Sequence, residues 1–168
     1  MSPGLTIDDP YPVTFMNNPD KPEASLFEIL RQRLGDQLGD YLIPPPVFQT
    51  LRGEFLAYEP QAGLLRIRFP VLNEYLNPYG SLQGGILAAA VDNTLGPLSM
   101  LVAPPNVTRR LEMKYSQAVT PDLGYILVEG RYLGAEGQYL KFSAEVRTPS
   151  GSLIARAQAY HWVITDQP

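Results

Sequence analysis

The feature that most constrains the fold of this chain is an apolar segment at residues 86–103, which contains a single ionisable residue, Asp92. The segment is about long enough to cross a membrane. It is interrupted, however, by Asn93 and by the pair Gly96 and Pro97, and no basic residue directly adjoins it. A helix that is apolar nearly all round is normally buried in a protein core. We therefore predict a core helix over residues 84–103 and no membrane span.

The predicted helix has two unlike faces, because residues three and four apart lie on the same side. A buried carboxylate without a partner is costly, so Asp92 either pairs with an arginine or backbone donor, as a structural acid does, or serves chemistry. The residue types alone leave both explanations open. The bulky face carries Leu87, Val91, Leu95 and Leu98, and the face of Asp92 carries Gly85, Ala88, Ala89, Gly96 and Ser99.

Alternating patterns on both sides of this helix predict strands. Leu140, Phe142, Ala144 and Val146, for example, alternate with polar residues. Since the connections are short, we expect an antiparallel meander, and segregated helix and sheet predict the α+β class. The predicted strands cover residues 52–59 and 63–72 before the helix, and 106–119, 124–133, 137–148 and 152–164 after it.

The N-terminal part is interpreted as a separate unit, residues 1–45, in front of a domain at residues 46–168. Residues 1–23 are rich in Pro, Asp and Asn and predict an irregular arm. Ser25 and Glu28 have the spacing of a capping box. Apolar residues then recur at helical spacing, which predicts an amphipathic helix over residues 25–42 that the prolines at 44–46 end.

The composition narrows the possible functions. A net charge of −4 does not favour nucleic-acid binding. With 0 cysteines and 1 histidine the chain has no thiolate chemistry and no cluster of histidines for a metal. The histidine, His161, is predicted to be a packed strand residue rather than a catalyst. The first residues lack the pattern of a secretory signal, so we expect a cytoplasmic protein.

The residues before the helix suggest a role for Asp92. Asn77 and Gly80 in "NPYG" favour a turn, and "QGG" then opens the helix. The N–H groups of Gly84 and Gly85 lie at the positive end of the helix dipole, where they would stabilise a developing oxyanion. Each feature alone is explained by a turn or by close packing. The three features together, the turn, the glycine pair and the aspartate within the helix, are much more specific than any one of them.

The stretch "NPYGSLQGGILAAAVDN" resembles the signature of hotdog-fold thioesterases of the phenylacetic-acid-degradation (PaaI-like) type, over about residues 50–164. The pattern of that family is Asn-x-x-Gly-x-x-His-Gly-Gly with an aspartate eight residues beyond the first glycine of the pair. The resemblance implies an antiparallel sheet wrapped around a long helix, with two subunits paired edge to edge. Gln83 departs from the pattern, because it stands where most members have histidine. Glutamine still donates and accepts hydrogen bonds but has no acid–base role.

The resemblance implies an acyl-CoA thioesterase that uses no cofactor or metal, with coenzyme A as part of the substrate, in a homodimer or homotetramer. Asp92 would act as nucleophile or general base, and the Gly84 amide would polarise the thioester carbonyl. Asn77 would position water or the thioester from the opposite subunit, with Gln83 orienting the carbonyl and Thr108 near the acid. Gly80, Gly85, Arg109 and Arg110 would bind substrate, and Lys114, Arg147 and Arg156 are further candidates for the phosphates.

Two other functions remain open. The loss of the histidine at Gln83 is compatible with a non-catalytic protein that binds or senses acyl-CoA. An enoyl-thioester hydratase ranks last, because that class uses a histidine beside its acid and none lies near Asp92 in sequence.

Overall fold

The computed structural model describes residues 25–164, so the irregular arm predicted for residues 1–23 lies outside the described part of the chain. The order of long elements is the predicted one: a helix, two strands, a long helix and four strands. The elements are α1 (Leu26–Leu34), η1 (Gly35–Asp40), α2 (Pro46–Thr50), β1 (Glu54–Glu59), η2 (Pro60–Ala62), β2 (Leu64–Pro70), η3 (Asn73–Tyr75), α3 (Gly84–Val102), β3 (Asn106–Tyr115), η4 (Pro121–Leu123), β4 (Tyr125–Glu136), β5 (Tyr139–Arg147) and β6 (Leu153–Val163).

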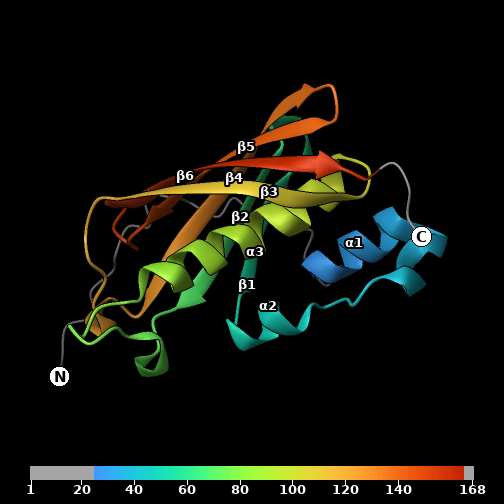
Figure 1. Cartoon of the computed structure of the whole chain (residues 1–168). Helices are drawn as coiled ribbons and strands as arrows, with labels where there is room; N and C mark the ends of the chain where they lie inside the picture. The colour runs from blue at the N-terminus through green and yellow to red at the C-terminus, as the bar shows by residue number, and fades with distance from the viewer. Residues whose placement is uncertain (1–24, 165–168) are drawn as a thin grey trace.

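The strands form one antiparallel sheet of 6 strands in the order β1-β2-β4-β5-β6-β3, and the sheet wraps around α3 (Figure 1). The predicted α+β class and hotdog architecture are thus confirmed. The prediction of a continuous meander is wrong for β3, which pairs with β6 at the edge and not with β4. The connection at residues 116–124 crosses the end of the sheet instead. Its Val119 carbonyl accepts a hydrogen bond from the Leu82 amide at 2.7 Å, which holds this connection beside the start of α3.

Helix α3 is buried, as predicted, and its bulky face packs into the core. Leu87 is 3 % exposed, and Val91, Leu95 and Leu98 are each 0 % exposed. The helix lies so close to β4 that a Cβ atom on Gly130 would stand 2.8 Å from a methyl carbon of Leu95. By length and composition α3 is apolar enough to cross a membrane, but half of the tested stretch is buried within the fold. This burial is that of a core helix.

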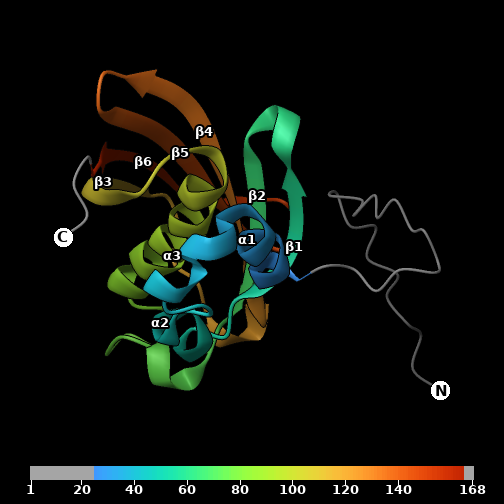
Figure 2. The same cartoon turned by 90° about the vertical axis from the view of Figure 1, so that its right-hand side faces the viewer.

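The N-terminal helices lie beside α3 rather than on the outer face of the sheet (Figure 2). Leu26 and Leu30 of α1 belong to the same hydrophobic cluster as the bulky face of α3. Phe48 of α2 makes edge-on ring contacts with Phe27 and Phe69. The boundary predicted between residues 45 and 46 stays a prediction, and both sides of it contribute to one core.

Helix α1 begins as predicted but is shorter. Ser25 forms the capping box with Glu28, since each side chain accepts the backbone N–H of the other residue. The α-helix ends at Leu34, not at residue 42, because Gly35 has a φ of 54° and its N–H bonds back to the Arg31 carbonyl. The 3-10 turn η1 follows, and the short helix α2 was not predicted. A glycine with a positive φ at a helix end is a common stop signal.

The strand pattern of the sheet agrees with the alternation in the sequence. Leu140, Phe142, Ala144 and Val146 of β5 are all at most 3 % exposed, and they face α3. Ala155, Ala157 and Ala159 of β6 are at most 4 % exposed and also belong to the core. The contacts of α3 with the sheet are mainly with β4, β3 and β2. Asp92 reaches β3, where it meets Thr108.

Candidate active site

Asp92 lies on the half-exposed small face of α3 and has a partner on β3. The Thr108 hydroxyl donates to Asp92 Oδ1 at 2.9 Å. The strand register shifts between Thr108 and Arg110, so Arg109 is the extra residue of a β-bulge. Bulges often re-aim a side chain beside a functional site. The structure therefore brings together two of the predicted site residues, Asp92 and Thr108.

His161 extends this pair into the core, a contact that the sequence reasoning missed. It is 1 % exposed and its ring centre lies 4.6 Å from that of Phe142, so the prediction that it packs within a strand is confirmed. Its Nε2 is 3.4 Å from Thr108 Oγ1, and its Nδ1 is 2.8 Å from Asn106 Oδ1. Burial lowers the pKa of His161, and the nearby charge of Asp92 acts in the opposite direction.

The start of α3 forms a second group of predicted residues. Gln83 is the N-cap residue, it is exposed, and its side chain makes no capping hydrogen bond. Gly84 and Gly85 occupy the first two helical positions, whose N–H groups have no partner within a helix. The Tyr115 hydroxyl donates to the Gly84 carbonyl at 2.8 Å. A cavity of about 350 Å³ borders Gly84, and Leu82, Leu87, Tyr115, Ser116, Gln117, Ala118 and Val119 line the rest of it.

Asn77 and Gly80 build the turn before the helix. Asn77 Oδ1 accepts the N–H groups of Tyr79 and Ser81 at 2.9 and 3.2 Å, and its Nδ2 donates to the Ser81 hydroxyl at 2.9 Å. Gly80 has a φ of 77°, which favours glycine, and its N–H bonds to the Asn77 carbonyl. The Asn77 side chain thus holds the turn with three hydrogen bonds, and one hydrogen of its amide group is left for a ligand.

The two groups of residues lie far apart on one helix. Asp92 follows Gly84 by eight residues within α3. With a rise of about 1.5 Å per residue, the two positions are roughly 12 Å apart along the axis. A single thioester carbonyl is much smaller than this distance. One chain therefore does not bring Asp92 and the Gly84 amide to the same carbonyl.

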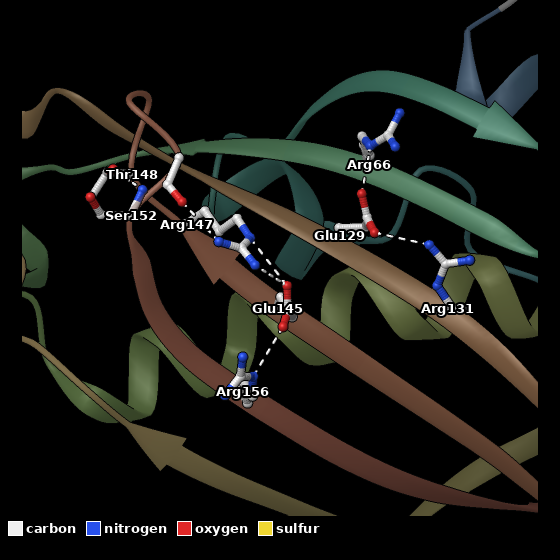
Figure 3. Close-up of polar contacts among 9 residues, drawn as sticks. Arg66, Glu129, Arg131, Glu145, Arg147, Thr148, Ser152 and Arg156 are labelled. Atoms are coloured by element: carbon white, nitrogen blue, oxygen red, sulfur yellow. Dashed lines mark hydrogen bonds and ion pairs between the residues drawn. The ribbon is translucent and has the colours of Figure 1, made fainter. Parts of the chain in front are cut away.

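The arginines predicted to meet coenzyme A are mostly engaged with carboxylates on the outer face of the sheet. Arg147 and Arg156 both bond to Glu145, with α3 behind the sheet (Figure 3). Burial acts to raise the pKa of Glu145, but hydrogen bonds from Arg156 and Arg147 outweigh it and lower that pKa. The same face carries a second group, in which Glu129 joins Arg66 and Arg131.

Arg110 also lies on this outer face, away from Asp92. It is paired with Glu112, and its guanidinium lies 6.0 Å from the centre of the Tyr160 ring. Arg109 is exposed at the bulge of the edge strand. The structure therefore does not bring Arg110 to the acid within one chain. Among the described residues, no group of three or more His, Cys, Asp or Glu side chains is arranged to hold a metal ion.

Comparison with solved structures places this arrangement in a known class of fold. The sheet around α3 is the hotdog fold, and the chain shares it with proteins of phenylacetic acid degradation. The PaaI protein of Escherichia coli is similar with a TM-score of 0.69 and 13 % identity, over 85 % of this chain and 99 % of that one. A phenylacetic acid degradation-related protein from Ralstonia eutropha has a TM-score of 0.68 and 24 % identity, over 80 % and 98 %.

A third structure carries a ligand. A hypothetical thioesterase from Streptococcus pneumoniae, determined with coenzyme A, has a TM-score of 0.62 and 18 % identity, over 69 % of this chain and 88 % of that one. Comparisons with models of protein families and with curated proteins gave no match. The predicted resemblance to PaaI-like proteins is thus confirmed in the fold.

Proposed function

We propose that this protein is an acyl-CoA thioesterase, which hydrolyses a thioester to a carboxylic acid and free coenzyme A. The observation that carries the proposal is the hydrogen bond between Thr108 and Asp92 on the small face of α3. A half-exposed carboxylate held by a hydroxyl is suited to accept a proton from water or to attack a carbonyl. The ligand-bound hotdog structure supports coenzyme A as the carrier of the acyl group.

The polarising group is the start of α3. Unpaired N–H groups at a helix N-terminus stabilise negative charge on an oxygen. Gly84 and Gly85 have no side chain, so a carbonyl oxygen reaches their amides without obstruction. The cavity beside Gly84 has apolar walls from Leu82, Leu87 and Val119, which suit an acyl chain or the pantetheine arm.

Two copies of the chain complete one site. The separation of about 12 Å along α3 between Gly84 and Asp92 supports a site in which the amide and the acid come from different subunits. Strand β3 is a mostly exposed edge strand that lies beside Asp92, and such an edge is suited to pair with a second copy. We therefore infer a homodimer in which Asp92 and Thr108 of one chain face the helix start of the other. Arg109, exposed on the same edge strand, is a candidate to meet the coenzyme A phosphates.

A thiol-release assay tests this function. Purified protein is incubated with short-chain, long-chain and aromatic acyl-CoA thioesters, and free coenzyme A is followed with a thiol reagent. Asp92→Asn removes the carboxylate at nearly constant volume and should lower kcat by about 10²–10⁴-fold. The matched control is Asp36→Asn, which changes an exposed carboxylate in η1. If the Asp92→Asn protein released thiol as fast as the wild type, the assignment of Asp92 as the catalytic carboxylate would be refuted.

Gln83 supports the alternative, a non-catalytic protein that binds acyl-CoA. Gln83 is exposed at the helix start and lacks the acid–base chemistry of the histidine in the family pattern. Calorimetric titration distinguishes the two functions. Binding of acyl-CoA with no thiol release across all three thioester classes would establish the alternative, whereas release that depends on Asp92 would exclude it.

A further inference from the structure

A series of hydrogen-bonding groups runs from Asp92 into the core and includes His161, the single histidine of the sequence. Thr108 Oγ1 is 2.9 Å from Asp92 Oδ1 and 3.4 Å from His161 Nε2. His161 Nδ1 is in turn 2.8 Å from Asn106 Oδ1. Thr108 and His161 are direct partners in the register of β3 and β6. The strand pairing therefore fixes the contact between the threonine and the histidine.

Asn106 determines which nitrogen of the ring carries the proton. Its Nδ2 donates to the Pro104 carbonyl at 2.8 Å, so its Oδ1 faces the histidine. Reversing the amide would place two oxygens, neither of which carries a proton, against each other at Pro104. An amide oxygen only accepts hydrogen bonds, so His161 Nδ1 carries the hydrogen. In the neutral ring, Nε2 is then an acceptor that faces Thr108.

Thr108 has one hydroxyl proton and two acceptors. While Asp92 is ionised, the proton goes to Asp92, because that contact is shorter and the acceptor is charged. Once Asp92 has taken a proton from water, its own O–H can donate to Thr108 Oγ1. The threonine hydroxyl then turns and donates its proton to His161 Nε2. Asp92 and Thr108 thus each have an acceptor for their proton again.

We propose that His161 is a positioning residue, which acts through Thr108 and keeps the threonine bonded to Asp92 in both protonation states of the acid. The role rests on the proposed thioesterase function with Asp92 as general base, in which Asp92 gains and loses a proton during each turnover. His161 itself contacts neither water nor substrate, because it is 1 % exposed. It supplies the second acceptor that lets the hydrogen bond reverse.

The surroundings of the ring keep it neutral, as this role requires. The groups that face it are Asp92 from α3, Thr108 and Asn106 from β3, and Phe142 from β5. Of these four only Asp92 is charged. Burial lowers the pKa of His161 more than the Asp92 charge raises it. A protonated ring would donate from Nε2 to Thr108 and would prevent the reversal, so activity should fall when the ring gains a proton.

Kinetics of single and double variants test the role. His161→Phe keeps a ring against Phe142 but removes the acceptor, and kcat should fall by roughly three- to tenfold with little change in KM. Thr108→Val with His161→Phe should be no slower than Thr108→Val alone, because the histidine acts through the threonine. His161→Gln restores an acceptor and should recover part of kcat. Independent losses that multiply in the double variant would overturn the proposal.

Nitrogen NMR gives a readout that does not depend on turnover. The chain has 1 histidine, so the imidazole signals need no assignment if the affinity tag contains none. We expect the neutral tautomer with the proton on Nδ1, and Asp92→Asn should lower the pKa of His161, because it removes a neighbouring negative charge. A proton on Nε2 at neutral pH would overturn the inference even in an active enzyme. Absence of any thiol release, with the expected tautomer present, would instead refute the function.

Discussion

The amide of Gly84 is the most informative group to remove, because the sequence position permits its removal with little damage to the fold. Gly84 is the first helical residue, a position where proline is favoured and where the missing N–H breaks no helical bond. Gln83 has a φ of −60° and a ψ of 131°, an extended conformation that proline requires of its predecessor. A Cβ at position 84 would be 3.4 Å from the Tyr115 ring, which is an ordinary contact.

Gly84→Pro should therefore fold normally and lose activity. Removal of one oxyanion donor costs about 2.7–4 kcal/mol, or about 10²–10³-fold in kcat. Gly84→Ala is the matched control, since it adds the same Cβ and keeps the N–H. Thiol release is measured for both, and thermal unfolding verifies that their stabilities agree. Equal activity of the two variants would show that the Gly84 amide polarises no carbonyl.

The same variant tests whether the site is shared between two chains. Gly84→Pro and Asp92→Asn subunits should each be nearly inactive as homodimers, and they are mixed by co-expression with different tags. A mixed dimer contains one intact site, in which Gly84 of one chain meets Asp92 of the other. Random pairing should then restore about a quarter of the wild-type activity. No recovery in purified mixed dimers would mean that the amide and the acid act within one chain, contrary to the separation of about 12 Å.

Three further outcomes follow from single contacts. Thr108→Val should lower kcat by roughly three- to tenfold through the lost bond to Asp92, and Thr108→Ser should retain most activity, measured by thiol release. Gly130→Ala should destabilise the fold by about 1–3 kcal/mol in urea unfolding, because the new methyl group would stand 2.8 Å from Leu95. Burial lowers the pKa of His161, so as the pH falls this histidine takes up a proton at a higher pH in the unfolded chain than in the folded protein. The free energy of unfolding should decrease below a pH of about 6.5, less steeply in His161→Gln; an unchanged slope would contradict this.

Local patterns were sufficient to predict most of the elements. The bulky face of α3 and the inward face of β5 follow from periodicity, which depends only on which side of an element each residue occupies. The capping box of Ser25 was also correct. The end of α1 was missed, although Gly35 is a local signal, because the apolar spacing continues beyond it and suggested a longer helix.

Part of the candidate site could also be predicted from the sequence. The turn of Asn77 and Gly80 and the helix start at Gly84 are local, because side chain and backbone groups within a few residues form them. Asp92 and Thr108 were predicted by resemblance, and their hydrogen bond agrees with it. The inward position of His161 could have been read from β6, since it has the same parity as Ala157 and Ala159.

The sequence by itself determined where α3 begins, that the helix is buried in the core and that its small face carries Asp92. It did not determine the neighbour of β3, because a strand pattern specifies the faces of a strand and not its partner. Only the tertiary structure placed β3 beside β6 at the edge of the sheet, with β5 and β6 between it and β4. That pairing brings Thr108 to His161, 53 residues away in the chain, and to Asp92 on the helix. The acid is thus a local feature, and its hydrogen-bonding partners follow from the packing of the whole sheet around α3.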